Sequence, residues 1–208
     1  MYGWRGRIGL IVPSVNTVIE PEFYKMMPEG IGVYTSRVKN AKTTSEDLVK
    51  MNASVARAAE ELSTANVDVI AYGCTTGSLV KGIQWEKDLC RRIEGLTDIP
   101  AITTSGAVIQ ALKAMGISRL AVVTPYPEEL NILEKKFLEQ NNIEVLNMRG
   151  LGIMEAVEIG EKSPGFVYRL AKNIFVPEAK GIFISCTNLR TVEIIEKLEN
   201  DIGRPVIT

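Results

Sequence analysis

The chain contains an internal repeat that spans most of its length. When the sequence is aligned with itself so that Cys74 falls on Cys186, several other positions match in the same ungapped register. These pairs are Pro13 with Pro125, Ile31 with Ile143, Val33 with Val145, Arg37 with Arg149, and Thr75 with Thr187. A repeat of this length is typical of a duplicated α/β unit, which predicts two lobes with a cleft between them. Because each copy carries one aligned cysteine, we expect the two thiols to face each other across the cleft.

Hydrophobic periodicity predicts the same series of strands and helices in both copies. In the first copy the predicted strands are 8–12, 31–38, 67–72 and 99–103, and the predicted helices are 20–27, 48–62 (capped by Thr44) and 75–93, helical after Gly77. A helix at 105–115 follows, and the second copy has strands at 120–124, 143–149, 181–185 and 205–208 and helices at 128–141, 164–175 and 189–199. Strands that alternate with helices are typical of a parallel sheet covered on both faces. We therefore predict an α/β fold of two pseudo-symmetric lobes, each a four-stranded parallel sheet flanked by helices, with the active site between them.

The repeat also predicts where the lobes divide. Residues 1–103 would form the first lobe and residues 104–208 the second. The segment 205–208 resembles 100–103, which runs on into a predicted helix, so we expect a corresponding helix beyond Thr208 that completes the first lobe. The glycine-containing stretch from Arg149 to Gly165 is predicted to be irregular and to line or cover the cleft.

Charge and hydropathy exclude several classes of partner. The chain has 24 Lys and Arg against 25 Asp and Glu, so it lacks the basic surplus typical of proteins that bind nucleic acid or anionic membranes. No apolar run approaches the roughly 20 residues that span a bilayer, and no cleavable leader is recognisable. We therefore expect a cytoplasmic protein that acts on a small molecule.

The chain has three cysteines and no histidine. Without histidine, the commonest general base and the commonest metal ligand are both missing, and no metal site is predicted. Cys74, Cys90 and Cys186 form neither a Cys-x-x-Cys pair nor an even set for disulfides, which is typical of a reducing compartment. Any chemistry must then rely on thiol, carboxylate, lysine, phenol or hydroxyl groups.

Polar residues follow several predicted strands, at the sheet edge where parallel α/β proteins bind ligands. Cys74 and Cys186 each follow a strand and are expected to begin a helix, whose dipole would lower the pKa of the thiol. The neighbouring side chains offer hydroxyl and amide groups to a substrate carboxylate and to the enediolate it becomes. The predicted substrate-binding residues are Ser14, Asn16, Thr75, Thr76, Tyr126, Thr187 and Asn188.

Each candidate also has a purely structural explanation. A single cysteine after a strand is commonly a small buried apolar residue, but the matched placement of Cys74 and Cys186 favours a function for the pair. Cys90 has no counterpart in the second copy, so we interpret it as structural. Asn16 suits a helix cap as well as a substrate ligand, and Tyr126 suits a turn.

Four segments resemble the aspartate/glutamate racemase superfamily, and within it the branch of the maleate isomerases and arylmalonate decarboxylases. The segments are GLIVPSVNT at 9–17, YGCTTGS at 72–78, VVTPY at 122–126 and SCTNLRT at 185–191. The resemblance covers essentially the whole chain. It implies an enzyme that needs neither metal nor cofactor and whose active site lies between two α/β lobes.

The resemblance also implies roles for individual residues. By analogy with maleate isomerases, Cys74 would be the thiolate that adds to the substrate double bond, and Cys186 would supply or remove the proton on the other side. In the racemases the same pair would act as base and acid on opposite faces of a carbon next to a carboxylate. Asn16 and Tyr126 match family positions that bind a carboxylate.

Two differences between this sequence and the related enzymes narrow the choice of activity. Thr75 and Thr76 match hydroxyl positions of the decarboxylase pocket, but the decarboxylases have glycine where this chain has Cys74. Amino acid racemases usually carry histidine after the threonine of the second cysteine motif, where this chain has Asn188 after Thr187. Both departures favour an isomerase.

The sequence therefore predicts a two-cysteine isomerase of a small dicarboxylate, of the maleate cis-trans isomerase type. The alternatives are an arylmalonate decarboxylase, a racemase of amino or hydroxy acids, and, outside the enzymes, a redox or ligand-binding protein whose two thiols form a disulfide. A Cα separation under about 7 Å would favour the disulfide. A homo-oligomer is left open, because no helix face in the sequence identifies an interface.

Overall fold

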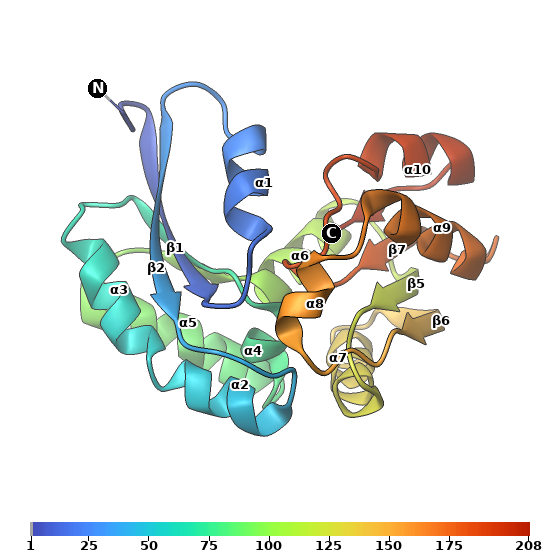
Figure 1. Cartoon of the computed structure of the whole chain (residues 1–208), viewed down its shortest axis with the longest axis horizontal. Helices are drawn as coiled ribbons and strands as arrows, with labels where there is room; N and C mark the ends of the chain where they lie inside the picture. The colour runs from blue at the N-terminus through green and yellow to red at the C-terminus, as the bar shows by residue number, and fades with distance from the viewer. Residues whose placement is uncertain (1) are drawn as a thin grey trace.

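The strands of the two repeats form two separate sheets in the computed structural model, which describes residues 2–208 (Figure 1). The first sheet has the order β2-β1-β3-β4 and the second β6-β5-β7-β8, and all neighbouring strands are parallel. The strands are β1 (Gly6–Pro13), β2 (Ile31–Val38), β3 (Val69–Tyr72), β4 (Ala101–Thr103), β5 (Arg119–Thr124), β6 (Glu144–Gly150), β7 (Gly181–Ile184) and β8 (Val206–Ile207). The identical order confirms the predicted fold of two pseudo-symmetric α/β lobes.

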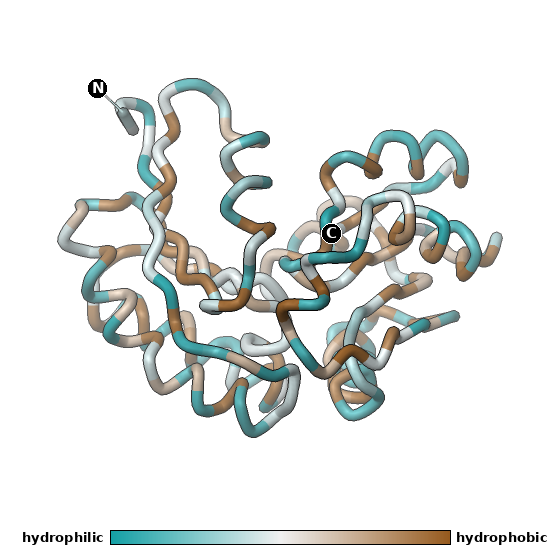
Figure 2. The backbone as a smooth tube through the Cα atoms, viewed as in Figure 1, coloured by the Kyte–Doolittle hydropathy of each residue, from teal (hydrophilic) through white to brown (hydrophobic). Residues whose placement is uncertain are grey.

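Helices surround both sheets. They are α1 (Ile19–Met26), α2 (Ser45–Asn52), α3 (Val55–Ser63), α4 (Thr75–Leu79), α5 (Ile83–Thr97), α6 (Thr104–Ala114), α7 (Glu128–Gln140), α8 (Ala156–Gly160), α9 (Pro164–Ile174) and α10 (Ile195–Ile202). Apolar residues concentrate on the strands and on the inner helix faces (Figure 2). Helix α6 follows β4 of the first sheet, yet its Val108 and Leu112 pack with Phe183 and Ile207 of the second sheet. Helix α6 therefore packs against the sheet of the other lobe, and these apolar contacts join the two lobes.

The central strand β1 shows why its sequence is continuously apolar. Leu10 and Val12 pack with Ile19 of α1 on one face of the sheet, while Ile11 packs with Ala58 of α3 on the other. A strand that is covered on both faces has no solvent side, so it lacks the polar alternation of a surface strand. The same burial applies to β5 at the centre of the second sheet.

The helix predicted at 48–62 is divided into α2 and α3. The two pieces separate at Ala53 and Ser54, because α2 packs against α4 while α3 packs against the first sheet and α5. The predicted cap is confirmed, since the Thr44 hydroxyl accepts a hydrogen bond from the backbone N–H of Asp47 at 3.3 Å.

The helix predicted at 75–93 is also divided. Helix α4 already begins at Thr75, before the glycine at which we expected it to start. The chain then turns at Gly82, whose φ of 85° is a conformation that residues with a Cβ rarely adopt, and α5 begins at the next residue. Helical periodicity alone does not reveal such a break.

The helix predicted at 189–199 was placed too early, and α10 begins only at Ile195. The backbone N–H groups of Thr191 and Val192 donate to the Glu22 carboxylate on α1, at 2.8 and 3.1 Å, and this contact from the other lobe holds the preceding segment in turns. The stretch predicted to be irregular, 149–165, does contain the short helix α8.

Candidate active site

The strand ends of both sheets meet at a small cavity of about 40 Å³ between the lobes. Eight of the predicted site residues line it: Asn16, Cys74, Thr75, Thr76, Tyr126, Cys186, Thr187 and Asn188. The remaining walls come from Pro13, Val15, Asn40, Thr43, Leu48, Ala156 and Ile159. Ser14 lies outside this lining, where its hydroxyl donates to the backbone C=O of Asn40 at 3.1 Å and accepts from the N–H of the same residue at 3.0 Å.

Cys74 is the buried N-cap residue of α4. Its sulfur accepts a hydrogen bond from the Gly77 N–H at 3.3 Å and lies 4.0 Å from the Thr76 hydroxyl. The prediction that the helix would lower the thiol pKa is wrong for the small cavity. Burial raises the pKa of Cys74, and the opposing contacts with Gly77, Thr76 and Tyr72 do not offset it, because a thiolate loses its hydration there.

Cys186 does not begin a helix, which corrects the second half of that prediction. Its φ of 104° lies in the region that favours glycine, and turns follow instead of a helical segment. The sulfur accepts a hydrogen bond from the Asn188 N–H at 3.4 Å. Burial, together with a smaller contribution from the neighbouring Cys74, raises the pKa of Cys186 to about 12. Backbone strain of this kind concentrates at functional sites, where the surrounding contacts enforce it.

A buried tyrosine hydroxyl supports each thiol. The Tyr72 hydroxyl donates to the Asn52 side-chain oxygen and lies next to Cys74, and Tyr126 lies next to Cys186; in each pair the phenol lowers the pKa of the thiol. Burial raises the pKa of both phenols well above the usual value, so each tyrosine stays protonated. Both sulfurs are free thiols in the structure.

Asn16 and Thr187 connect the two lobes by hydrogen bonds. The Asn16 side chain donates to the Thr187 hydroxyl at 2.9 Å, and this hydroxyl donates to the backbone C=O of Gly73 at 3.0 Å. The Asn16 carbonyl oxygen accepts from the N–H groups of Val18 and Ile19 at 2.9 and 3.0 Å. The cap-like role that the sequence left open for Asn16 is therefore present, and it is combined with a contact between the lobes.

Asn188 forms a second connection. Its side-chain oxygen accepts from the Thr17 N–H and its amide donates to the Ala156 C=O of α8, both at 3.0 Å. Next to it, the Thr43 N–H donates to the Met154 C=O at 2.9 Å, and Lys42 pairs with Glu155 in an antiparallel bridge. The segments around Thr43 and α8 thus cover the cavity from both lobes.

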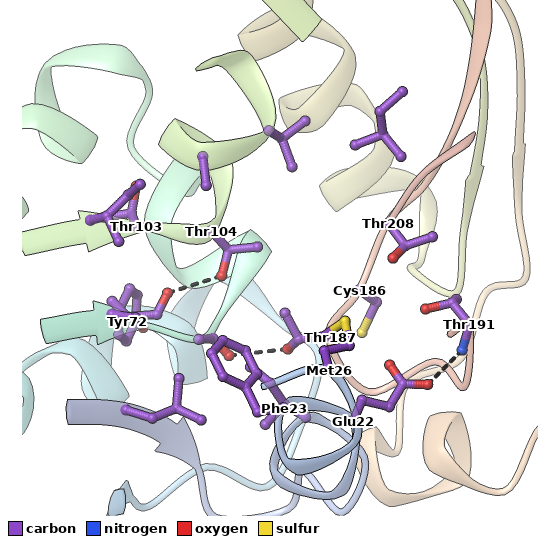
Figure 3. Close-up of a pocket in the computed structure, with 18 of the residues that line it drawn as sticks. Glu22, Phe23, Met26, Tyr72, Thr103, Thr104, Cys186, Thr187, Thr191 and Thr208 are labelled. Carbon is purple, nitrogen blue, oxygen red and sulfur yellow. Dashed lines mark hydrogen bonds between the residues drawn. The ribbon is translucent and has the colours of Figure 1, made fainter. Parts of the chain in front are cut away.

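A larger groove of about 320 Å³ is also lined by Cys186 (Figure 3). Its walls are largely apolar and include Phe23 and Met26 of α1, Val108 of α6, and Ile207. Figure 3 also shows the Glu22 contact to Thr191 at its edge. Cys186 and Thr187 line both the groove and the small cavity, so they form the partition between the two.

Residues 2–208 contain no group of three side chains suited to hold a metal ion. Within the same range, none of the helices combines the length and the apolar character that crossing a membrane requires. The polar side chains that line the cavity offer thiol, hydroxyl and amide groups.

Comparison with known proteins identifies the family. The model of the arylmalonate decarboxylase family matches residues 8–208. The chain belongs to this family. A maleate isomerase of Geobacillus stearothermophilus is 30% identical, with 97% of this chain and 86% of the relative covered, and the arylmalonate decarboxylase of Bordetella bronchiseptica is 26% identical, with 97% and 84% covered.

Solved structures of the family have the same fold. The maleate isomerase Iso of Pseudomonas putida S16 matches with a TM-score of 0.92 at 29% identity, covering 97% of this chain and 87% of that one. A cysteine-to-alanine variant of that isomerase bound to maleate matches with the same TM-score at 28% identity, covering 97% and 86%. The resemblance predicted from the four sequence segments is thereby confirmed.

The prediction from sequence missed three residues of this family member's site: Tyr72, Glu134 and Ser185. Tyr72 had a readable signal, because residues two apart on a strand share a face and Cys74 follows at that spacing. Glu134 also had one, since it falls at helical spacing between the apolar Leu130 and Phe137 and therefore carries a carboxyl group on the buried stripe of α7.

Proposed function

We propose that the protein is a maleate isomerase, an enzyme that converts a cis dicarboxylate into its trans isomer with two cysteines. The observation that carries the proposal is that the two free thiols, one from each lobe, line one small cavity together with hydroxyl and amide donors. The chain is similar over 97% of its length to several maleate isomerases, which supports the same activity.

In the proposed reaction Cys74 acts as the nucleophile. Its thiolate forms a bond to one alkene carbon, and the electron pair of the double bond moves toward the adjacent carbon and its carboxylate. Cys186 then gives its proton to that carbon. After rotation about the new single bond, the Cys186 thiolate removes the proton, the sulfur–carbon bond breaks, and the trans product leaves. Atoms and charge balance, so no oxidant or reductant is needed.

The contacts of the thiols support this assignment of roles. Cys74 has three groups that favour its thiolate, namely the Gly77 N–H and the hydroxyls of Thr76 and Tyr72, whereas Cys186 has the Asn188 N–H and the Tyr126 hydroxyl. The hydroxyl of Thr75 has no hydrogen-bond partner within residues 2–208, so it is free to donate to a substrate carboxylate in the cavity.

Contacts between the covering segments restrict access to the cavity. The Thr43 N–H donates to the Met154 C=O just before α8, and Thr43 and Ala156 both line the cavity. We infer that the covering segments around Thr43 and α8 move apart, and that Cys74 ionises while water still reaches it. Closure then removes the enediolate from water, as closing segments do in other enzymes.

The test is to incubate purified protein with maleate in heavy water and to follow fumarate by proton NMR and ultraviolet absorbance. We expect fumarate from the wild type and from Cys90→Ser, the matched control because Cys90 lies on α5 outside the cavity lining. Cys74→Ser and Cys186→Ser should each lose about two orders of magnitude or more, the usual effect of removing a nucleophile or a proton-transfer group. Unchanged maleate with all four proteins would contradict the proposal.

A decarboxylase is the second candidate, and one observation favours it. The apolar groove of about 320 Å³ ends at Cys186 and would accommodate an aryl group next to that thiol. Phenylmalonate is therefore the second substrate to test. Release of carbon dioxide that survives Cys74→Ser would identify a one-cysteine decarboxylase, whereas a disulfide formed from Cys74 and Cys186 under mild oxidation, with no turnover of either acid, would identify a redox protein.

The proposal extends to the cellular compartment and the oligomeric state of the protein. Free thiols at the site suit a reducing compartment such as the cytoplasm. Tyr24 and Ile132 are large apolar residues that lie exposed on α1 and α7, where they would suit self-association. Light scattering on a sizing column distinguishes a monomer from a homo-oligomer.

A further inference from the structure

Behind Cys186 the structure buries a carboxyl group that the proposed reaction does not use. Glu134 on α7 is 1% exposed and lies in the apolar layer between the lobes. Burying a carboxylate without a cation is costly, and no cationic group contributes to its environment. Burial raises the pKa of Glu134 to about 8, so its carboxyl group is largely protonated at neutral pH.

The carboxyl group begins a chain of hydroxyls that ends at the thiol. Glu134 Oε1 lies 2.6 Å from the hydroxyl oxygen of Ser185, and that oxygen lies 3.3 Å from the hydroxyl oxygen of Tyr126. The Tyr126 hydroxyl in turn lies next to Cys186 and lowers the pKa of its thiol. Ser185 and Tyr126 are both buried, so water does not compete for these contacts.

The two carboxyl oxygens differ in their contacts. Glu134 Oε2 is buried and has no hydrogen-bond partner within residues 2–208, whereas Oε1 contacts Ser185. A proton on Oε1 is the one that can be donated to the Ser185 oxygen.

We propose that neutral Glu134 is a positioning residue that orients the hydroxyls of Ser185 and Tyr126 toward Cys186. A carboxylic O–H at Oε1 donates to Ser185, the Ser185 O–H then donates to Tyr126, and the Tyr126 O–H is left to donate to the sulfur. This order stabilises the Cys186 thiolate that forms when the thiol gives its proton to the substrate carbon. The proposal rests on the proposed function, because it takes Cys186 as the proton-exchanging thiol.

Ionisation of Glu134 would reverse the direction of the hydrogen bonds that link it to Ser185 and Tyr126. A carboxylate accepts from Ser185, so the Ser185 oxygen then attracts the Tyr126 proton away from Cys186, and the negative charge also opposes a thiolate. The titratable groups near Glu134 are Tyr126 and Cys186. The side chains that face it from α4 and α6 do not titrate in this range: Thr75, Leu79, Ser105 and Val108. Glu134 is therefore the group expected to control the change near pH 8.

The test measures the thiol directly and needs no substrate. In a Cys74→Ser, Cys90→Ser background, Cys186 is the remaining cysteine, and its alkylation by iodoacetamide is followed by mass spectrometry from pH 6 to 10. Glu134→Gln keeps a donor to Ser185 and cannot ionise, whereas Glu134→Leu has a similar size and no donor. At pH 7 we expect the Gln variant to react like the parent and the Leu variant about tenfold more slowly, which corresponds to one pKa unit.

The pH profile gives the second readout. The alkylation rate of Cys186 in the parent should stop rising above about pH 8. In the Gln variant the alkylation rate should continue to rise with pH and become about tenfold faster than in the parent near pH 9.5. Ser185→Ala breaks the chain without changing Glu134 and should react like the Leu variant, which keeps the test usable if the Leu variant does not fold. Glu139→Gln, at an exposed position of the same helix, is the matched control and should leave the profile unchanged.

Two results would overturn the inference: equal alkylation of the Gln and Leu variants at pH 7, or the same loss of slope above pH 8 in the Gln variant. The outcome is separate from that of the proposed function. If the alkylation follows the expected pattern but maleate is not converted, the isomerase assignment fails and the positioning of Cys186 stands. If maleate is converted but the variants alkylate alike, the role of Glu134 fails alone.

Discussion

Replacement of Asn16 by alanine should destabilise the fold, because the asparagine serves both the α1 segment and the contact between the lobes. Its carbonyl oxygen accepts from the N–H groups of Val18 and Ile19, both 5% exposed, and its amide donates to Thr187. In Asn16→Ala two buried N–H groups lose their acceptor, which costs about 1–3 kcal/mol per unsatisfied group. Because the two N–H groups shared one oxygen, we expect a total loss of about 2–4 kcal/mol in the free energy of unfolding.

Two comparisons separate these contributions. Asn16→Asp keeps an acceptor for both N–H groups, loses the donation to Thr187 and buries a charge, so it should lose about 1 kcal/mol for the hydrogen bond and a further amount that disappears when the carboxyl group is protonated at low pH. Thr187→Val removes the partner hydroxyl with little change in shape. In a double-mutant cycle of Asn16→Ala with Thr187→Val, the coupling free energy should be about 1 kcal/mol, the net value of one hydrogen bond.

Urea denaturation at constant pH, followed by circular dichroism, measures each of these values. A loss under about 0.5 kcal/mol for Asn16→Ala, the range of ordinary surface substitutions, would refute the reasoning. It would mean that water replaces the side chain at the N–H groups, and that Asn16 is free to serve the substrate alone.

Three further predictions follow from the geometry of the site. Cys186→Gly should be about 1 kcal/mol more stable to urea than Cys186→Ala, because φ at this position is 104° and a Cβ is disfavoured there. At position 59 in the interior of α3 the wild-type alanine should instead be more stable than Ala59→Gly, and greater stability with glycine at both positions would contradict the inference of backbone strain at Cys186. The free energy of unfolding should decrease by about 1.4 kcal/mol per pH unit from about pH 4.5 toward pH 8 because of Glu134, whose folded-state pKa of about 8 lies above the value of 4.5 expected when unfolded. The folded protein keeps a proton that the unfolded chain releases, so this stabilisation is complete below pH 4.5 and is lost as the pH approaches 8; Glu134→Gln should remove the slope and Glu139→Gln should keep it. Asn188→Ala removes two hydrogen bonds that hold α8 to the first lobe, so amide hydrogen exchange in α8 should accelerate about tenfold or more, and unchanged exchange would show that other contacts hold the cover.

The sequence patterns predicted the architecture correctly, but they placed the ends of several helices wrongly. The apolar runs identified all eight strands described in residues 2–208, because strands in a covered parallel sheet are continuously hydrophobic. The breaks at Ala53 and at Gly82, and the late start of α10, depend on partners elsewhere in the chain. Glu22 is the clearest case, since a carboxylate of the first lobe binds the backbone of the segment before α10.

The sequence by itself determined that the chain is built twice and that one cysteine in each copy follows a central strand. The physical reason is that both features are local: periodicity sets the strands, and strand ends in parallel sheets carry the functional residues. Only the tertiary structure decided the state of those thiols. Helix position predicted a lowered pKa, but burial between the lobes raises the pKa of Cys74 and of Cys186, because desolvation depends on what the rest of the chain packs around the sulfur. Tyr126 and Glu134 likewise become neighbours of Cys186 only in the folded second lobe, because they lie far from it in the sequence.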